Sequence, residues 1–274
     1  GGGEVTAFEF KMQSLGGVVF DVECTGTAVR RRKSLVGLQV VLRDISERKK
    51  LESKLIRSYQ SLGKAKAATI LGLARLAEYR DLSTGKHLER MREYSKLLVE
   101  QLGKNPEYNG YITSQYIDDL YQSAILHDIG KVGVSDTILL KTGTLSPQEF
   151  NAIKLHTIYG RDILKEVDSE VEGQSFLSMG KTIAYSHHEK WDGSGYPDGL
   201  KRAQIPLSAR CVALADVYDA LTSSRIYKPP FSHEKAKQLI LQQKGVHFAS
   251  DVVESFVFCE EGFKNVLETF RSMS

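Results

Sequence analysis

The chain has 274 residues, of which 41% are hydrophobic and 26% are charged, a balance that is ordinary for a globular protein with a sizeable core. The net charge of +3 is too small to indicate a nucleic-acid polymer as partner. No apolar run approaches the roughly 20 residues that a membrane helix needs. Cys24, Cys211 and Cys259 form no CxxC pair, so we expect free thiols and a cytoplasmic location.

Residues 1–45 are predicted to form a small antiparallel sheet. Short β-prone runs occur at 8–12, 18–24 and 35–42, and the basic run 30–33 between the last two predicts an exposed hairpin tip. The sequence VVLRDISERKKLE at 40–52 resembles the last strand and exit helix of a PAS sensor domain. This resemblance implies that 1–45 is the C-terminal half of such a domain.

Residues 46–66 are predicted to form a linker helix, and the helical pattern continues to about residue 79. Leu51, Leu55 and Leu62 lie near a 3.5-residue spacing on an otherwise polar segment, with Asp44 or Ser46 as the helix cap. A narrow apolar stripe is typical of a two-stranded coiled coil, and it predicts a homodimer through this helix. A helix that packs on its own domain is the alternative.

Residues 67–274 are predicted to form a helical domain. Apolar residues recur every three or four positions in 88–102, 115–126, 147–165, 207–221 and 234–242, and glycines and prolines separate these runs. Little in this stretch is typical of a strand. The predicted fold class is therefore mainly α, with a small antiparallel β segment and a linking helix at the N-terminal end.

Three short motifs carry chemically unusual residues. His127 and Asp128 end an apolar run, and burying such a pair is costly unless the two are paired with each other or bind a metal ion. His187 and His188 precede a glycine-rich loop, whose backbone can approach a ligand closely. Asp216 and Asp219 are three residues apart and share one helix face. A hydrogen-bonded core pair is the alternative for the first motif, and salt-bridged or capping aspartates are the alternative for the third.

The motifs HDxGK at 127–131, HHExWDGxGYP at 187–197 and ADxYDALT at 215–222 occur in an order that resembles the HD-GYP subfamily of the HD phosphohydrolases, over about residues 68–260. The resemblance implies a cluster of two divalent transition metals, Fe or Mn, with Asp128 bridging them. Ser83 stands where some members have a glutamate for a third metal, and we expect His233 to be exposed. The implied metal ligands are His87, His127, Asp128, His156, His187, His188 and Asp216.

The resemblance also implies hydrolysis of cyclic di-GMP to pGpG, with further cleavage to GMP left open. Lys131 and Asp128 are the expected catalytic residues, because Lys131 can neutralise charge on the phosphoryl oxygens. The expected substrate-binding residues are Tyr196, Arg225, Lys228 and Asp219, and Asp219 could instead orient a metal ligand. The alternatives are a phosphodiesterase for another cyclic dinucleotide, such as 3′,3′-cGAMP, and a signalling module that binds cyclic di-GMP with weak or no activity.

Overall fold

The computed structural model describes residues 6–32, 34–79, 86–170, 173, 175–223 and 229–272. The chain divides into two compact units, Gly1–Ala68 and Thr69–Ser274, and helix α1 contributes residues to both. The strands of the chain are β1 Thr6–Gln13, β2 Val19–Arg31 and β3 Ser34–Asp44. Its α-helices are α1 Ser46–Glu78, α2 His87–Leu102, α3 Ser114–Ser123, α4 Asp136–Leu139, α5 Pro147–Lys154, α6 His156–Ser169, α7 Phe176–Ser186, α8 Leu207–Thr222, α9 His233–Gln242, α10 Ser250–Phe258 and α11 Glu260–Ser272. Short 3₁₀ helices are η1 Pro106–Tyr108, η2 Ala124–Leu126, η3 Ile129–Gly133 and η4 Arg202–Gln204.

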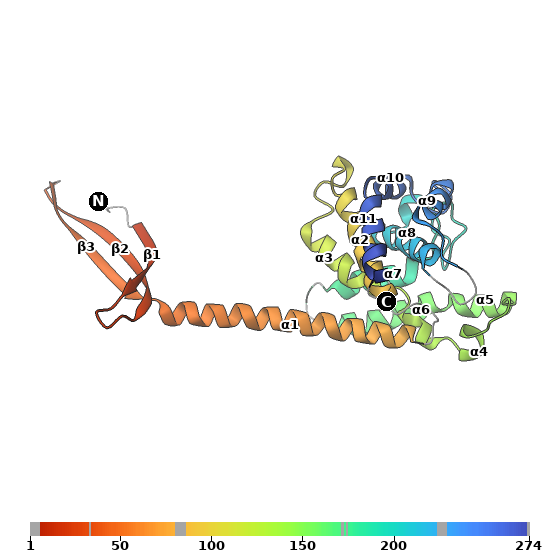
Figure 1. Cartoon of the computed structure of the whole chain (residues 1–274), viewed down its shortest axis with the longest axis horizontal. Helices are drawn as coiled ribbons and strands as arrows, with labels where there is room; N and C mark the ends of the chain where they lie inside the picture. Colours follow the sequence, from red (N-terminus) through yellow and green to blue (C-terminus); the bar gives the residue numbers. More distant parts are fainter. Residues whose placement is uncertain are drawn as a thin grey trace. The chain divides into compact units, whose positions relative to one another are not determined.

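The first unit is an antiparallel sheet in the order β1-β2-β3, followed by the first part of α1 (Figure 1). This confirms the predicted meander. The Asp44 carboxylate accepts a hydrogen bond from the backbone N–H of Ser46 at 2.9 Å, so Asp44 caps α1. The hairpin tip is exposed, as predicted, and Arg32 adopts a positive φ of 49° there.

Helix α1 is polar over most of its length. Near its start, Lys49 pairs with Glu9 of β1 at 2.9 Å, which ties the helix to the sheet. Leu51, Leu55 and Leu62 are more than half exposed, so the apolar stripe is uncovered in the single chain. The residues of α1 that are buried lie at its other end, within the second unit.

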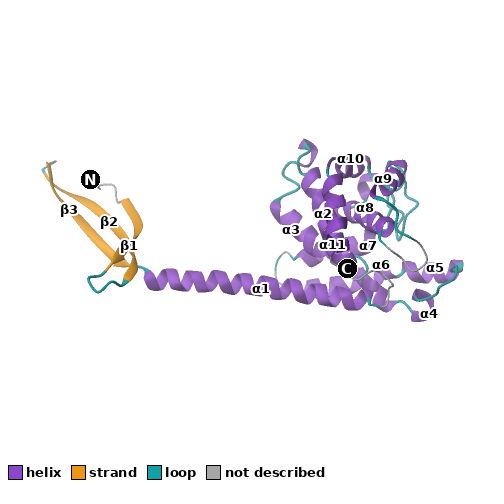
Figure 2. Cartoon of the chain, viewed as in Figure 1, coloured by secondary structure: helices purple, strands orange, loops and turns teal. Residues whose placement is uncertain are grey.

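The second unit is built of helices joined by loops (Figure 2). Its main core gathers around α2 and α8, where Tyr94 stacks on Phe263 with the ring centroids 4.6 Å apart and meets Tyr218 edge-on at 5.1 Å. Helix α8 is apolar on nearly every side because it lies inside the bundle. A smaller cluster joins the end of α1 to η2, α6 and α7 through Ala74, Ile125, Leu164 and Ala184.

The predicted fold class is confirmed, although some helix limits differ. The run 147–165 is two helices, which separate at Leu155. The run 115–126 ends as α3 at Ser123 and continues as η2. Within the described ranges, no helix is long and apolar enough to cross a membrane.

Candidate metal centre

Four histidines at helix ends converge on one region of the second unit. His87 and His156 begin α2 and α6, whereas His127 and His187 directly follow η2 and α7. The ring centroids of His87 and His127 are 5.4 Å apart. The centroid of His187 lies 5.3 Å from that of His127 and 5.5 Å from that of His156. Helix ends therefore present the imidazoles, although the four residues are far apart in sequence.

Local backbone geometry orients three of these rings in the same way. Nδ1 of His127 lies 2.9 Å from the Ala124 carbonyl, and Nδ1 of His156 lies 2.7 Å from that of Ile153. Nδ1 of His187 lies 3.0 Å from the carbonyl of Ile183. A carbonyl can only accept, so the proton must sit on Nδ1 and donate to it. In its neutral form, each ring then presents the lone pair of Nε2 inward, and this is the form that binds a metal ion.

Asp128 lies at the centre of these rings. Its Oδ1 is 3.3 Å from Nε2 of His156 and 3.7 Å from Nε2 of His187, while its Oδ2 is 3.2 Å from Nε2 of His127. Lys131 reaches the same Oδ2 with its ammonium group at 2.7 Å. One carboxylate thus faces three imidazole nitrogens and one cation.

A bound cation fits this arrangement. Nε2 of His127, His156 and His187 and Oδ1 of Asp128 are buried and have no hydrogen-bond partner among the described residues. Leaving a buried polar atom unsatisfied costs about 1–3 kcal/mol, so four in one place need an explanation. Imidazole and carboxylate groups are the ligands of first-row divalent metals. Asp128, His156, His187 and His188 offer atoms within 4.8 Å of one another, as do Glu78, His87 and His127.

The charge states of His156, His188 and Asp128 also suit a metal ion. Burial lowers the pKa of His156 to about 4 and holds that of His188 well below its usual value, so both rings are neutral at pH 7. Burial would raise the pKa of Asp128, but Lys131 and His127 hold it well below its usual range. Burial opposes the charged form of His127, yet the Asp128 carboxylate outweighs it and raises the pKa of His127.

His87 is oriented by a carboxylate. Its Nδ1 lies 2.7 Å from Oδ2 of Asp219, which is 2% exposed. Arg90 holds both oxygens of Asp219, with Nε 2.6 Å from Oδ1 and Nη2 2.9 Å from Oδ2. Asp219 therefore occupies the orienting position behind a candidate ligand, where a substrate has no open path to its carboxylate.

Tyr196 lies against the same cluster. Its ring centroid is 4.7 Å from that of His188, with the planes tilted by 32°, and the Lys154 ammonium group is 5.4 Å from the Tyr196 centroid. Burial raises the pKa of Tyr196, so its hydroxyl stays protonated and can donate a hydrogen bond. An aromatic face and a donor are thus available beside the candidate ligands.

Glu189 shapes the loop that carries Tyr196. Its buried carboxylate accepts hydrogen bonds from the backbone N–H groups of Asp198, Gly199 and Leu200 at 2.8, 3.1 and 3.0 Å. At Gly195, a Cβ would lie 2.4 Å from the Lys190 nitrogen, so the backbone approaches too closely for any side chain. The loop is therefore held by main-chain contacts that depend on both residues.

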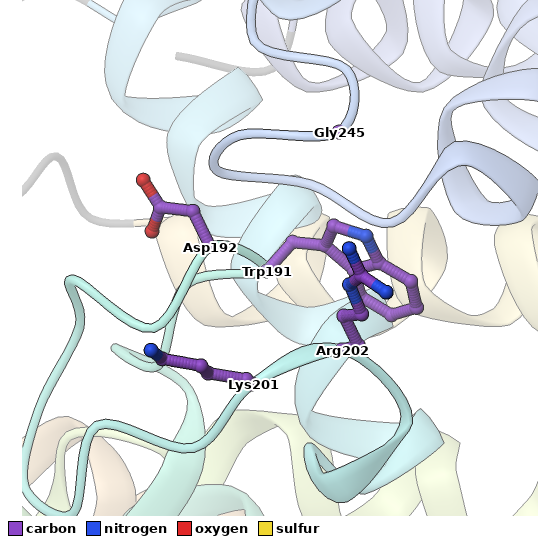
Figure 3. Close-up of a pocket in the computed structure, with 5 residues that line it drawn as sticks. All are labelled: Trp191, Asp192, Lys201, Arg202 and Gly245. Atoms are coloured by element: carbon purple, nitrogen blue, oxygen red, sulfur yellow. The ribbon is translucent and has the colours of Figure 1, made fainter.

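A separate pocket is lined in part by residues of this loop (Figure 3). It has a volume of about 790 Å³ and is lined by Trp191, Asp192, Lys201, Arg202 and Gly245. The backbone N–H groups of Trp191 and Asp192 donate to the carbonyls of His247 and Val246 at 3.0 and 2.9 Å, which fixes one wall of the pocket. It contains none of the candidate metal ligands.

Six of the seven sequence-predicted ligands fall into the two groups of candidate ligands, and the charge of Asp216 also acts on His127 and Tyr196. Asp216 is half-buried on α8 and belongs to neither of the two ligand groups found among the described residues. Ser83, Arg225 and Lys228 lie outside the described residues. The expectation for His233 is wrong, because its side chain is only 9% exposed and bonds to the Tyr218 hydroxyl at 2.8 Å.

Sequence reasoning missed Glu78 and Arg90 as members of this site. Glu78 lies nine residues before His87, whereas the expected position of an extra glutamate was four residues before it. One signal was available, because Ile70, Ala74 and Glu78 share a helix face that is otherwise apolar. A carboxylate on such a face indicates a buried partner.

Comparison with known proteins gives the family. The family model described as "HD domain" matches residues 50–252. A relative named "Cyclic di-GMP phosphodiesterase" from Vibrio cholerae is 49% identical over 202 residues, which are 74% of this chain and 41% of that protein. One of the same name from Thermotoga maritima is 41% identical over 191 residues, 70% of this chain and 48% of that protein. A "3'3'-cGAMP-specific phosphodiesterase 2" from V. cholerae is 37% identical over 185 residues, 68% of this chain and 33% of that protein. The chain spans about half the length of its curated relatives or less, and it belongs to the HD domain family.

Proposed function

We propose that this chain hydrolyses cyclic di-GMP, in the manner of an HD-GYP phosphodiesterase. The observation that carries the proposal is the set of buried, inward-facing imidazole nitrogens around Asp128, which have no other partner among the described residues. Relatives named for this activity match most of the chain at 38–49% identity, which supports the same substrate.

Two divalent metals, Fe or Mn, are proposed as cofactors. His87, His127, Asp128, His156, His187, His188 and Asp216 would hold them, with Asp128 shared. When bound, such metals activate water and neutralise charge on a phosphodiester. The described residues fit this role because the ligand atoms lie within 4.8 Å of one another in two groups, and because the rings of His156 and His188 are neutral.

Residues of the chain complete the proposed reaction. Lys131, held 2.7 Å from Asp128, is proposed to neutralise charge on a non-bridging phosphoryl oxygen. Tyr196 would meet a phosphate with its hydroxyl or a guanine with its ring. Arg225 and Lys228 are proposed to contact the second phosphate or a guanine edge. Asp219 is proposed to keep His87 in the ligating orientation.

A second candidate substrate is 3′,3′-cGAMP. Relatives named as specific for that dinucleotide also match this chain, at 37% identity in one case, so both substrates have to be compared. The test is a turnover panel of cyclic di-GMP, 3′,3′-cGAMP and pGpG with Mn²⁺, and with Fe²⁺ under anaerobic conditions. Faster turnover of cyclic di-GMP, with loss in His187→Ala, supports the proposal. Turnover of 3′,3′-cGAMP alone, or equal turnover by His187→Ala, overturns it.

The first unit is proposed to belong to a PAS-type sensor, with α1 as the dimerising helix that links it to the enzyme. The three-stranded sheet followed by a helix suits the end of such a domain. The exposed stripe of Leu51, Leu55 and Leu62 supports pairing with a second copy of the chain.

A further inference from the structure

The last residue of α1 reaches the candidate metal centre. Oε1 of Glu78 lies 3.7 Å from Nε2 of His87, and both side chains are only 10% exposed. Together with His127, they offer ligand atoms that lie within 4.8 Å of one another. Two imidazoles and a carboxylate on one side of a metal position form a common ligand set for a first-row divalent ion.

Both imidazoles are prepared to bind on the side that faces Glu78. Nδ1 of His87 is committed to Asp219 at 2.7 Å, and Nδ1 of His127 is committed to the Ala124 carbonyl at 2.9 Å. The remaining nitrogen of each ring, Nε2, is therefore the ligating atom. Nε2 of His127 is fully buried and makes no hydrogen bond within the described part of the chain. Oδ2 of Asp128 lies 3.2 Å from it and is a candidate ligand of the same cation.

The end of α1 is fixed to the elements that carry these histidines. Ala74 belongs to the apolar cluster that includes Leu88 of α2 and Ile125 of η2. Arg75 also pairs with Glu89 of α2. The backbone of Glu78 is thus held within the second unit by packing that does not involve its own carboxylate.

We propose that Glu78 is a ligand of the metal ion held by His87 and His127, so that α1 completes this half of the centre. The proposal rests on the proposed metallo-phosphodiesterase function, which it deepens. The carboxylate comes from the helix that leads in from the first unit and not from the position of Ser83. Metal occupancy then depends on the Glu78 carboxylate, and this helix becomes part of the active site.

The test measures metal binding by Glu78→Gln. Wild type, Glu78→Gln and Glu89→Gln are purified anaerobically, and bound Fe and Mn are counted by mass spectrometry. Each metal-stripped protein is then titrated with Mn²⁺. Glu89→Gln is the matched control, since it removes a carboxylate from the same helix joint and weakens the pairing with Arg75. We expect Glu78→Gln to lose about one metal equivalent, or to bind its weakest metal ~10-fold less tightly or worse. Glu89→Gln should keep the wild-type metal count.

A Glu78→Gln protein with the metal count and Mn²⁺ affinity of wild type overturns the inference. If that variant also hydrolyses cyclic di-GMP at the wild-type rate, the proposed function stands. A wild type that binds no metal overturns both the role of Glu78 and the proposed function. If circular dichroism shows that Glu78→Gln does not fold, Glu78→Asp replaces it, since it keeps the charge and withdraws the carboxylate by one methylene. Weaker Mn²⁺ binding by Glu78→Asp then supports the inference, and unchanged binding overturns it.

Discussion

At the scale of single residues, the site depends on how each imidazole is turned. Sequence motifs predicted the residues around Asp128, because adjacent His-Asp and His-His pairs are costly to bury without a metal ion. They could not predict the bond from His87 to Asp219, since 132 residues separate the two. Glu78 was missed for a related reason, because no local spacing relates this glutamate to a histidine nine residues later.

Replacing Asp219 tests the orienting role directly. Asp219→Asn keeps the shape of the side chain but removes the charge that His87 and Arg90 share. We expect metal affinity to fall about 10–100-fold, measured by Mn²⁺ titration. Asp162→Asn is the control, because Asp162 is exposed and pairs with Arg161 on the surface of α6. Metal affinity in Asp219→Asn equal to that of the control would exclude the orienting role.

Metal binding should also depend on pH through His127. The Asp128 carboxylate overcomes burial and raises the pKa of His127, so below that pKa a metal ion must displace a proton. His156 has its pKa lowered to about 4 and releases no proton at neutral pH. Mn²⁺ affinity is therefore expected to rise between pH 6 and pH 8, by up to about tenfold per unit for one proton. Titrations of metal-stripped protein that give one affinity across this range would contradict this.

At the scale of elements, two glycines bring η3 onto α6. A Cβ on Gly130 would lie 1.9 Å from the His156 carbonyl and 2.4 Å from the Gly160 nitrogen. This contact sets Asp128 against His156. The predicted run 147–165 splits into two helices in a way that supports the same geometry. At the break, Nδ1–H of His156 donates a hydrogen bond to the Ile153 carbonyl. Apolar periodicity predicted most helices, but it could not reveal a break that involves a polar side chain.

Gly130→Ala is expected to disrupt this contact. The added methyl group meets backbone atoms that cannot move aside. We therefore expect the free energy of unfolding to fall by about 1–3 kcal/mol, as is typical of overpacking, and metal binding to weaken. Thermal unfolding and Mn²⁺ titration measure the two effects. Gly143→Ala is the matched control, since no atom lies within 4 Å of a Cβ there. Equal melting temperatures for the two variants would refute the close-packing explanation.

At the scale of the whole molecule, the sequence predicted a sheet, a helix and a helical domain in the correct order. The physical signals were strong, since strand and helix periodicities differ and glycines and prolines separate the runs. The helices α4, α7, α10 and α11 were not among the predicted runs. The packing of α11 follows from contacts distant in sequence, such as that between Tyr94 and Phe263. What remains a prediction is how copies of the chain associate.

Charge placed in the stripe of α1 should prevent that association. Leu55→Glu with Leu62→Glu puts like charges where the two helices of a coiled coil would meet, so a dimer is expected to become a monomer. Sedimentation at several protein concentrations measures this. Lys64→Glu is the control, because it adds a charge change on the opposite face of the same helix. A wild type that is monomeric at all concentrations would contradict pairing through α1.

The most direct test of the central claim is metal-dependent hydrolysis of cyclic di-GMP by this chain. Protein stripped of metal is assayed before and after Mn²⁺ or anaerobic Fe²⁺ is restored, beside Asp128→Asn treated in the same way. The account predicts that stripped wild type is inactive, that it forms pGpG once metal returns, and that Asp128→Asn stays at least ~100-fold slower. Hydrolysis that survives removal of metal, or that is unchanged in Asp128→Asn, would contradict the account.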